Sequence, residues 1–393
     1  MSKAKLVEIS KQDLAHGRAG TVAQADSIYA VPVEHYYEAG RWQQEMQQIF
    51  RRMPLMLATT AELREPGSYK AMEAAGVQVL ITRNRDGQVR AFVNMCSHRG
   101  ARLVAPGHGT AHKFTCPYHA WTYSPDGDLV AVYAADDFGD VEKSCNGLTA
   151  LPCLEKAGLI WVTLNPESDL DIETFLSGYD SMLAEFGFDS WHFFAAQRVD
   201  GPNWKVAYDG YLDYYHLPIL HKDTFGTDIG NQANYYAWGP HQHMGRPTEE
   251  WAEYEDLPEE DWPTEKMLSG VWTIFPHISI ASFDGGGRGV MISQLFPGDT
   301  PETSYTIQNY LMEHPPADDE VAASARQQFD FLKFVVQEED YATGLALQKN
   351  LPVGAKKQVL FGRNEAGGQD FHKWVDRIIE TPDDGLADLF KSS

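Results

Sequence analysis

The chain has 393 residues, of which 43% are hydrophobic and 22% charged, a composition typical of a globular protein with a substantial core. Its 32 Lys and Arg against 56 Asp and Glu give a net charge of −24, which disfavours nucleic-acid binding because phosphates carry the same sign. No apolar run is long enough to span a membrane, and no apolar secretory signal follows Met1. With only four cysteines, these features predict a cytoplasmic protein without a disulfide framework.

The first part of the chain predicts a helix followed by a small β-rich domain. Residues 34–53 place apolar side chains at helical spacing. Asp-Gly pairs at 86–87 and 126–127 each stand between two strand-like runs, which is typical of a β-hairpin. A further strand is expected at 159–164 and closes an all-β domain over residues 55–165.

The next part of the chain predicts a return to helix. A helical stripe of apolar side chains occupies residues 175–186. Residues 225–268 are acidic and rich in aromatic side chains but have no clear period, so we expect a long loop or lid there.

The last part predicts strands and then a long helix. A helix is expected from about Asp319 to Gln348, and a glycine-rich turn at 284–287 should join two of the strands. The strand-like runs lie at 271–282, 289–296 and 303–312. The expected fold class is therefore α+β, with residues 1–54 and 166–393 forming a larger domain that has an antiparallel sheet flanked by helices.

Two short segments of the β-rich domain each offer one thiolate and one imidazole. Cys96 and His98 are two residues apart, and Cys116 and His119 are three apart. Thiolates favour iron–sulfur clusters or zinc. In a Rieske centre two cysteines bind one iron and two histidines the other, whereas zinc sites usually pair like ligands. The mixed pairs therefore favour a [2Fe–2S] cluster, with a structural zinc site as the alternative.

A second candidate metal site contains His216 and His221. Five residues rotate a helix by about 140°, so the two side chains cannot share a face of a straight helix. Pro218 lies between them and disfavours helical geometry at Leu217. A helix that ends near His216, followed by a turn, would let both imidazoles reach one metal.

An acidic third ligand is expected on the long C-terminal helix, where Glu339 and Asp340 are adjacent. Helical angles place Glu339 near the middle of the apolar stripe and Asp340 about 80° away from it. The helical wheel alone therefore favours Glu339.

The segments at 96–100 and 116–121 resemble the Rieske ring-hydroxylating oxygenases, specifically their α (terminal oxygenase) subunits. Both the Cys-x-His-Arg-Gly and the Cys-Pro-Tyr-His-x-Trp box match that family residue for residue. The resemblance implies a Rieske [2Fe–2S] domain at 55–165 and makes the rest of the chain the catalytic domain. One iron of the cluster would be bound by the two cysteines, Cys96 and Cys116, and the other by the two histidines, His98 and His119.

The stretch from Asn203 to His221 is also similar to the family pattern: Asn-Trp-Lys, a carboxylate, two residues, His, four residues, His. The resemblance implies that His216, His221 and Asp340 bind a mononuclear Fe(II) as a 2-His-1-carboxylate triad. The resemblance favours Asp340 over Glu339, because family members of this size have an Asp eight residues before a Gln, which is Gln348 in this chain. Asp213 would link the mononuclear iron to a cluster histidine of the neighbouring subunit.

The resemblance implies a terminal oxygenase that takes electrons through the cluster to the mononuclear Fe(II). Oxygen from O₂ would enter an apolar or aromatic substrate by hydroxylation, cis-dihydroxylation or oxidative dealkylation. A Rieske electron-transfer protein with a non-catalytic docking domain is the alternative. The aromatic side chains expected to line the substrate pocket are Tyr208, Tyr211, Trp272, Phe275, His277 and Phe283.

The expected partners follow from the same resemblance. No glycine-rich motif opens a helix as a nicotinamide or flavin site requires, so electrons from NAD(P)H must arrive through a separate reductase, directly or by way of a ferredoxin. A bridge between subunits requires an oligomer, and family members form head-to-tail trimers. The chain length favours a homotrimer over an assembly with additional β subunits.

Overall fold

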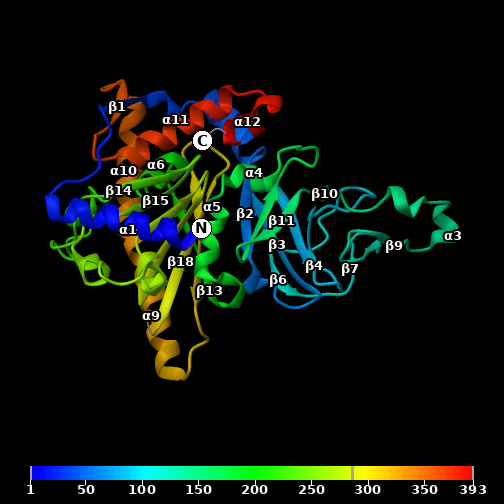
Figure 1. The fold of residues 1–393 in the computed structure, drawn as a ribbon. Coiled ribbons are helices and arrows are strands. Elements are labelled where there is room, and N and C mark those ends of the chain that lie inside the picture. The colour runs from blue at the N-terminus through cyan, green and yellow to red at the C-terminus, as the bar shows by residue number, and fades with distance from the viewer. Residues whose placement is uncertain (1, 285–286, 392–393) are drawn as a thin grey trace. The chain divides into compact units, whose positions relative to one another are not determined.

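The computed structural model describes residues 2–284 and 287–391 and divides into two compact units (Figure 1). The smaller unit consists of Phe50–Ile172 with Phe188–Ser190, and the larger unit contains the rest of the chain. The glycine-rich turn predicted at 284–287 lies partly outside the described residues. Within the described chain, no helix is both long enough and apolar enough to cross a membrane.

The regular secondary structure of the smaller unit consists mainly of antiparallel strands joined by loops. Its strands are β2 (Pro54–Thr59), β3 (Ser68–Ala74), β4 (Val77–Arg83), β5 (Val89–Val93), β6 (Gly107–Thr110), β7 (Phe114–Thr115), β8 (Thr122–Tyr123), β9 (Leu129–Ala131), β10 (Ala150–Leu151), β11 (Cys153–Lys156) and β12 (Leu159–Thr163). They form one five-stranded sheet in the order β10-β5-β4-β3-β6 and two three-stranded sheets, β11-β12-β2 and β7-β8-β9.

Both predicted hairpins of the smaller unit are confirmed. β4 pairs with β5, and β8 pairs with β9. Gly87 and Gly127 have φ values of 78° and 87°, a left-handed conformation that glycine adopts without a steric penalty. The two Asp-Gly pairs therefore predicted the turns correctly, because the conformation that requires glycine is confined to the turn itself.

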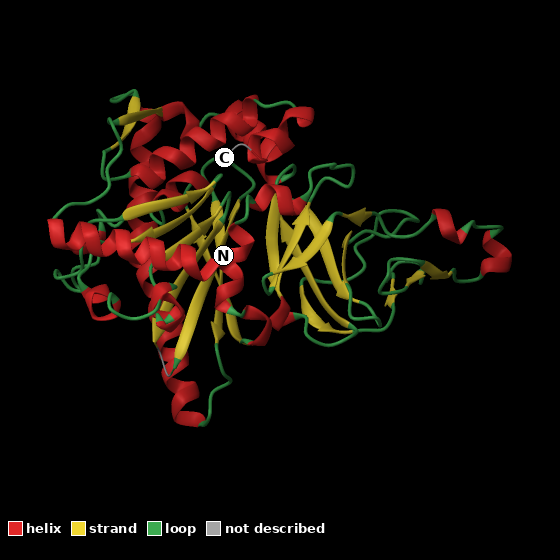
Figure 2. Ribbon diagram, viewed as in Figure 1, coloured by secondary structure: helices red, strands yellow, loops and turns green. Residues whose placement is uncertain are grey.

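The larger unit contains a seven-stranded antiparallel sheet in the order β13-β19-β18-β17-β16-β15-β14. Its strands are β13 (His192–Gly201), β14 (Asn234–Trp238), β15 (His241–Gly245), β16 (Val271–Ile274), β17 (Ile278–Asp284), β18 (Arg288–Pro297) and β19 (Ser304–Met312). A separate pair joins β1 (Tyr29–Pro32) to β20 (Gln358–Phe361). The α+β fold class is confirmed, and Figure 2 shows helices around the sheet of this unit.

Most of the helices belong to the larger unit. The α-helices are α1 (Ser2–Ala19), α2 (Ala39–Glu45), α3 (Ala135–Phe138), α4 (Ile172–Leu176), α5 (Tyr179–Leu183), α6 (Trp204–Asp209), α7 (Leu217–Leu220), α8 (Thr264–Met267), α9 (Asp319–Val335), α10 (Ala342–Asn350), α11 (Ala366–Glu380) and α12 (Leu386–Lys391). Two π-helical segments are η2 (Met46–Phe50) and η9 (Val336–Tyr341). The 3-10 segments are η1 (Val33–Tyr36), η3 (Thr60–Glu62), η4 (Lys143–Cys145), η5 (Ala184–Phe186), η6 (Phe188–Ser190), η7 (Glu250–Tyr254), η8 (Glu259–Asp261), η10 (Leu351–Val353) and η11 (Asp383–Gly385).

Three expectations about the larger unit are wrong in detail. The stretch 225–268 is not one long loop, because it supplies β14, β15 and α8. The run 271–282 is a hairpin of two strands, β16 and β17, rather than one strand. The helix predicted from 319 to 348 is interrupted by the π-helical segment η9, which changes the rotation of every residue after Val335.

Candidate metal centres and active site

His216 and His221 stand at the two ends of the short helix α7. The helix has Pro218 in its first turn, where the missing N–H group of proline leaves no helical hydrogen bond unmade. The expectation that a helix ends near His216 is therefore wrong, since α6 has already ended at Asp209 and α7 begins after His216. One turn of α7 brings the two imidazole rings to a centroid distance of 5.1 Å.

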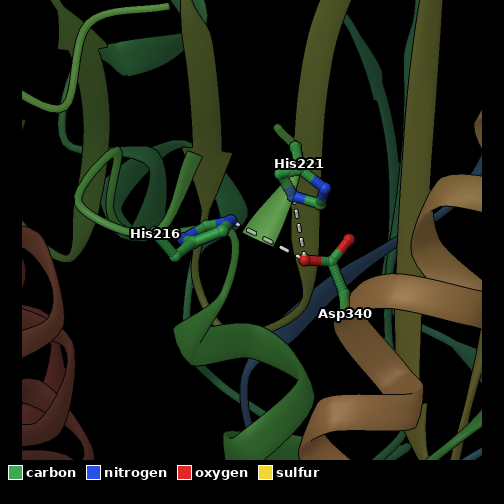
Figure 3. Close-up of side chains that lie close together, drawn as sticks. All are labelled: His216, His221 and Asp340. Atoms are coloured by element: carbon green, nitrogen blue, oxygen red, sulfur yellow. Dashed lines mark ion pairs between the residues drawn. The ribbon is translucent and has the colours of Figure 1, made fainter. Parts of the chain in front are cut away.

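Asp340 approaches both imidazoles from the π-helical segment η9 (Figure 3). Its Oδ1 lies 3.7 Å from His216 Nε2 and 3.2 Å from His221 Nε2. One potential ligand atom from each of the three residues lies within 4.8 Å of the others. Ligands bound about 2 Å from one ion lie roughly 3–4 Å apart, so the three side chains fit a single metal ion.

Each of these histidines has a carboxylate on its other ring nitrogen. His216 Nδ1 lies 2.9 Å from Asp213 Oδ1, which also accepts a hydrogen bond from the backbone N–H of His216. His221 Nδ1 lies 2.7 Å from Glu339 Oε2. A carboxylate that accepts the Nδ1 proton leaves the Nε2 lone pair free for a metal and fixes the orientation of the ring.

Glu339 and Asp340 thus take different positions at the same site. The pairing of Glu339 with an Nδ1 atom is reinforced by Thr224, whose hydroxyl donates to Glu339 Oε2 at 2.9 Å. A helical wheel with 3.6 residues per turn favoured Glu339 as the metal ligand. Both residues lie in η9, however, and a π-helical turn contains more residues, so the angular positions that the wheel assigned to Glu339 and Asp340 do not apply. π-Helical segments of this kind are frequent at functional sites.

The carboxylates also change the proton affinity of His221. Burial acts to lower its pKa, but Asp340 and Glu339 outweigh that effect, and the pKa is raised. An ion at Nε2 must displace a proton from the imidazole, so metal binding here becomes weaker as the pH falls.

The second candidate centre lies in the loops of the smaller unit that follow β5 and β7. Cys96 and Cys116 are buried, and the rings of His98 and His119 lie 4.7 Å apart, centroid to centroid. His98 stacks on Trp121 at 4.9 Å. The structure therefore places two thiols and two imidazoles on neighbouring loops.

The donor set of these loops fits a two-iron cluster. His119 Nδ1 is buried, and it has no hydrogen-bond partner in the described part of the chain, as expected of a nitrogen reserved for a metal. Within the same part, only the group around Asp340 is tight enough to surround one ion. Two thiolates for one iron and two imidazoles for the other is the ligand set of a Rieske cluster, and these loops supply that set.

A cavity of about 480 Å³ in the larger unit contains His216, His221 and Asp340 in its wall. Of the six aromatic residues predicted to line it, Tyr211 and Phe283 do so. The other four are buried elsewhere in the larger unit, and the prediction is wrong for them: Tyr208, Trp272, Phe275 and His277.

Part of the cavity wall could not be found from the sequence. Helix α1 contributes Ile9, Ser10 and Asp13, although it is about two hundred residues from the histidines along the chain. The segment 243–251, within the stretch expected to be a loop, lines another part. No sequence motif marks either segment as part of the cavity wall, because their positions there depend on the packing of segments that are far apart in the chain.

Two family models match this chain. The Rieske [2Fe–2S] domain matches residues 53–149, and the catalytic domain of the ring-hydroxylating α subunits matches residues 188–381. The chain belongs to the ring-hydroxylating oxygenase α subunits. In this family the first domain holds a Rieske cluster and the second binds a mononuclear iron, so the zinc alternative is excluded.

Curated relatives of this α subunit include monooxygenases. It is 25% identical over 336 residues to the carnitine monooxygenase oxygenase subunit of Escherichia coli K12, covering 84% of this chain and 86% of that protein. It is 29% identical over 213 residues to the glycine betaine monooxygenase oxygenase subunit of Chromohalobacter salexigens, covering 54% and 47% of the two chains.

Solved structures share the fold. The quaternary ammonium Rieske monooxygenase CntA in complex with L-carnitine has a TM-score of 0.75 at 21% identity, covering 90% of this chain and 97% of that one. Naphthalene 1,2-dioxygenase from Rhodococcus sp. bound to indole has a TM-score of 0.75 at 20% identity, covering 95% and 98%. The family models and the curated relatives identify the chain as the terminal oxygenase subunit of a Rieske oxygenase, so the alternative of a Rieske electron-transfer protein with a non-catalytic docking domain is wrong.

Proposed function

We propose that His216, His221 and Asp340 hold the catalytic Fe(II) of this oxygenase. The observation that carries the proposal is the approach of one Asp340 oxygen to the Nε2 atoms of both histidines, at 3.7 and 3.2 Å. Two imidazoles and one carboxylate on one side of an iron leave coordination positions open for O₂. The cavity that these residues line would place the substrate beside those positions.

The cluster ligands are proposed from the loops of the smaller unit. Cys96 and Cys116 would bind one iron, and His98 and His119 the other, which raises the potential above that of an all-cysteine cluster. Tyr123 supports this centre, because its hydroxyl lies 3.2 Å from Cys96 Sγ and also accepts a hydrogen bond from the backbone of Ser97.

The proposed domain bounds place the cluster ligands and the ligands of the mononuclear iron in separate domains. Residues 55–165 form the Rieske domain, and residues 1–54 and 166–393 form the catalytic domain. The family models support this division, because they match 53–149 and 188–381 respectively.

We also propose that Asp213 connects the two kinds of centre between subunits of a homotrimer. Apolar side chains are exposed beside each of them: Ile219 is 75% exposed on α7, and Tyr118 is 58% exposed next to His119. Contact between subunits at these two places would remove both apolar side chains from water. For CntA, inter-subunit electron transfer is described. Electrons would reach the cluster from a separate reductase, directly or through a ferredoxin.

The proposed substrate is a small molecule with an apolar or aromatic body. Naphthalene 1,2-dioxygenase, whose fold this chain shares, binds the aromatic molecule indole, whereas the monooxygenase relatives named above act on the charged molecules carnitine and glycine betaine. A cavity of about 480 Å³ has room for molecules of either kind. Oxygen insertion into such a substrate would give hydroxylation, cis-dihydroxylation or oxidative dealkylation, depending on which carbon faces the iron.

The test of the triad uses isotopically labelled O₂. Wild-type protein, reconstituted with iron and a reductase, should form ¹⁸O-labelled product from at least one member of a panel of aromatic and N-methylated compounds. Asp340→Ala should lose both the mononuclear iron and product formation. Glu338→Ala is the matched control, since Glu338 lies in the same π-helical segment but outside the iron-binding group, and it should retain both. Product formation by Asp340→Ala at the wild-type rate would refute the assignment.

A further inference from the structure

Asp13 places a carboxylate in the wall of the cavity that contains the proposed iron ligands. The residue is only 5% exposed. Its Oδ1 accepts hydrogen bonds from Asn234 Nδ2 at 2.6 Å and from the Tyr236 hydroxyl at 2.8 Å. Its Oδ2 has no hydrogen-bond donor among the residues that the structure describes. One oxygen of a buried carboxylate is therefore left available to a ligand.

The backbone beside this oxygen is glycine. Gly245 lines the same cavity, and a Cβ atom at that position would come within 2.5 Å of Asp13 Oδ2. Any larger residue would therefore displace the carboxylate from its present place. The absence of a side chain at Gly245 lets the Asp13 carboxylate lie against the backbone of β15 without a clash.

Asp13 also lacks a counter-ion. No Lys, Arg or His forms an ion pair with it in the described part of the chain, and Arg246, which lines the same cavity, is exposed and does not pair with it. Burial raises the pKa of Asp13 to about 6, so the group is mostly ionised at neutral pH. A buried anion without a partner is unfavourable, and a bound cation would relieve that cost.

Aromatic residues accompany the carboxylate in the cavity wall. Tyr214 and Trp251 both line the cavity. The Tyr214 hydroxyl donates a hydrogen bond to the carbonyl oxygen of Met244 at 3.0 Å, and Met244 immediately precedes Gly245, which lies against Asp13. Because Tyr214 precedes His216 by two residues, this part of the cavity adjoins the proposed iron-binding loop. Aromatic faces attract cations, most strongly where water is excluded.

We propose that Asp13 is a specificity-determining residue that binds a cationic nitrogen of the substrate, in the form of a protonated or quaternary amine. The inference rests on the proposed function only in taking the cavity beside His216 and His221 as the substrate site. It narrows the substrate from an apolar or aromatic molecule to one that also carries a positive charge at nitrogen.

Matched pairs of probes test this without turnover. Choline and 3,3-dimethylbutan-1-ol have the same shape but differ in charge, as do benzyltrimethylammonium and neopentylbenzene. Binding is measured by calorimetry on the iron-loaded oxygenase in the absence of reductase. Wild type should bind at least one cation about tenfold or more tightly than its neutral partner, which corresponds to about 1.4 kcal/mol. Asp13→Asn keeps the hydrogen-bond acceptor but not the charge, and should bind the two members of that pair within about twofold.

Two further variants keep the result interpretable. Asp13→Glu retains the charge and should retain a preference for the cation. Glu249→Gln removes an exposed carboxylate from the same segment at a position outside the cavity lining, and should leave the preference unchanged. The inference is overturned if wild type binds neither cation, does not prefer a cation to its isostere, or keeps that preference after Asp13→Asn. Binding with the predicted preference but without product formation would instead count against the proposed iron chemistry.

Discussion

His221 Nδ1 lies 2.7 Å from an oxygen of Glu339, the residue that immediately precedes the proposed iron ligand Asp340. Asp340 lies at the other ring nitrogen, Nε2. The carboxylates of these two adjacent residues on η9 therefore lie on opposite sides of the His221 imidazole. His216 has the equivalent arrangement, with Asp213 on Nδ1. Both histidines are thus oriented by carboxylates that do not belong to the iron-binding group itself.

Replacing Glu339 by Gln should weaken iron binding without removing a ligand. Gln can still hydrogen-bond, but it lacks the charge that makes the imidazole a stronger donor. Loss of such an outer partner typically costs about 10–100-fold in metal affinity. The rate of iron transfer to a chelator, followed optically, measures this effect. The same rate in Glu338→Gln serves as the control, and equal rates for the two variants would show that Glu339 does not support the site.

Replacing Asp213 by Asn should separate electron transfer from metal binding. The side chain can still accept the hydrogen bond from His216, so both the mononuclear iron and the cluster should remain bound in near-wild-type amounts. Loss of the charged link should slow oxidation of the reduced cluster by O₂ in the presence of substrate. Rapid mixing with optical detection of the cluster gives that rate. If the variant instead loses its iron, Asp213 acts chiefly in positioning His216, and the bridging role is wrong.

The raised pKa of Asp13 makes a prediction for stability. The carboxyl ionises near 3.8 when unfolded and near 6 when folded, so the folded protein holds the proton more tightly between these values. The contribution of Asp13 to the free energy of unfolding therefore falls as the pH rises through this window. Between about pH 5 and about pH 7.5 the loss is about 1.4 kcal/mol.

Asp13→Asn should lack this pH dependence. The melting temperature of the ligand-free variant, relative to wild type, should rise by about 3 °C between about pH 5 and about pH 7.5. Scanning calorimetry of both proteins at each pH measures the difference. A constant difference would mean that Asp13 ionises at the same pH in the folded and unfolded protein.

The parts of the molecule that the sequence predicted correctly depend on local chemistry. The turns at Gly87 and Gly127 follow from a backbone conformation that favours glycine. The Cys and His boxes of the Rieske loops are short and have a ligand spacing that few other sites share, so the family could be identified from them.

The parts that could not be predicted depend on packing between distant segments. The position of Asp340 relative to Glu339 is set by a π-helical turn, which a wheel of constant period cannot represent. Asp13 reaches the cavity only because α1 packs against the segment that contains η7 and α8. Strand β15 was missed because both of its faces are buried, which leaves no alternation of polar and apolar residues along it.

The central claim, a catalytic iron held by His216, His221 and Asp340, is tested most directly by electron paramagnetic resonance of the nitric oxide complex. Nitric oxide binds Fe(II) at an open position and gives a signal distinct from that of the reduced cluster. Wild-type protein should show both signals. His216→Ala and Asp340→Ala should each lose the nitric oxide signal while retaining the cluster signal in full. A nitric oxide signal of wild-type intensity in both variants would contradict the proposed site.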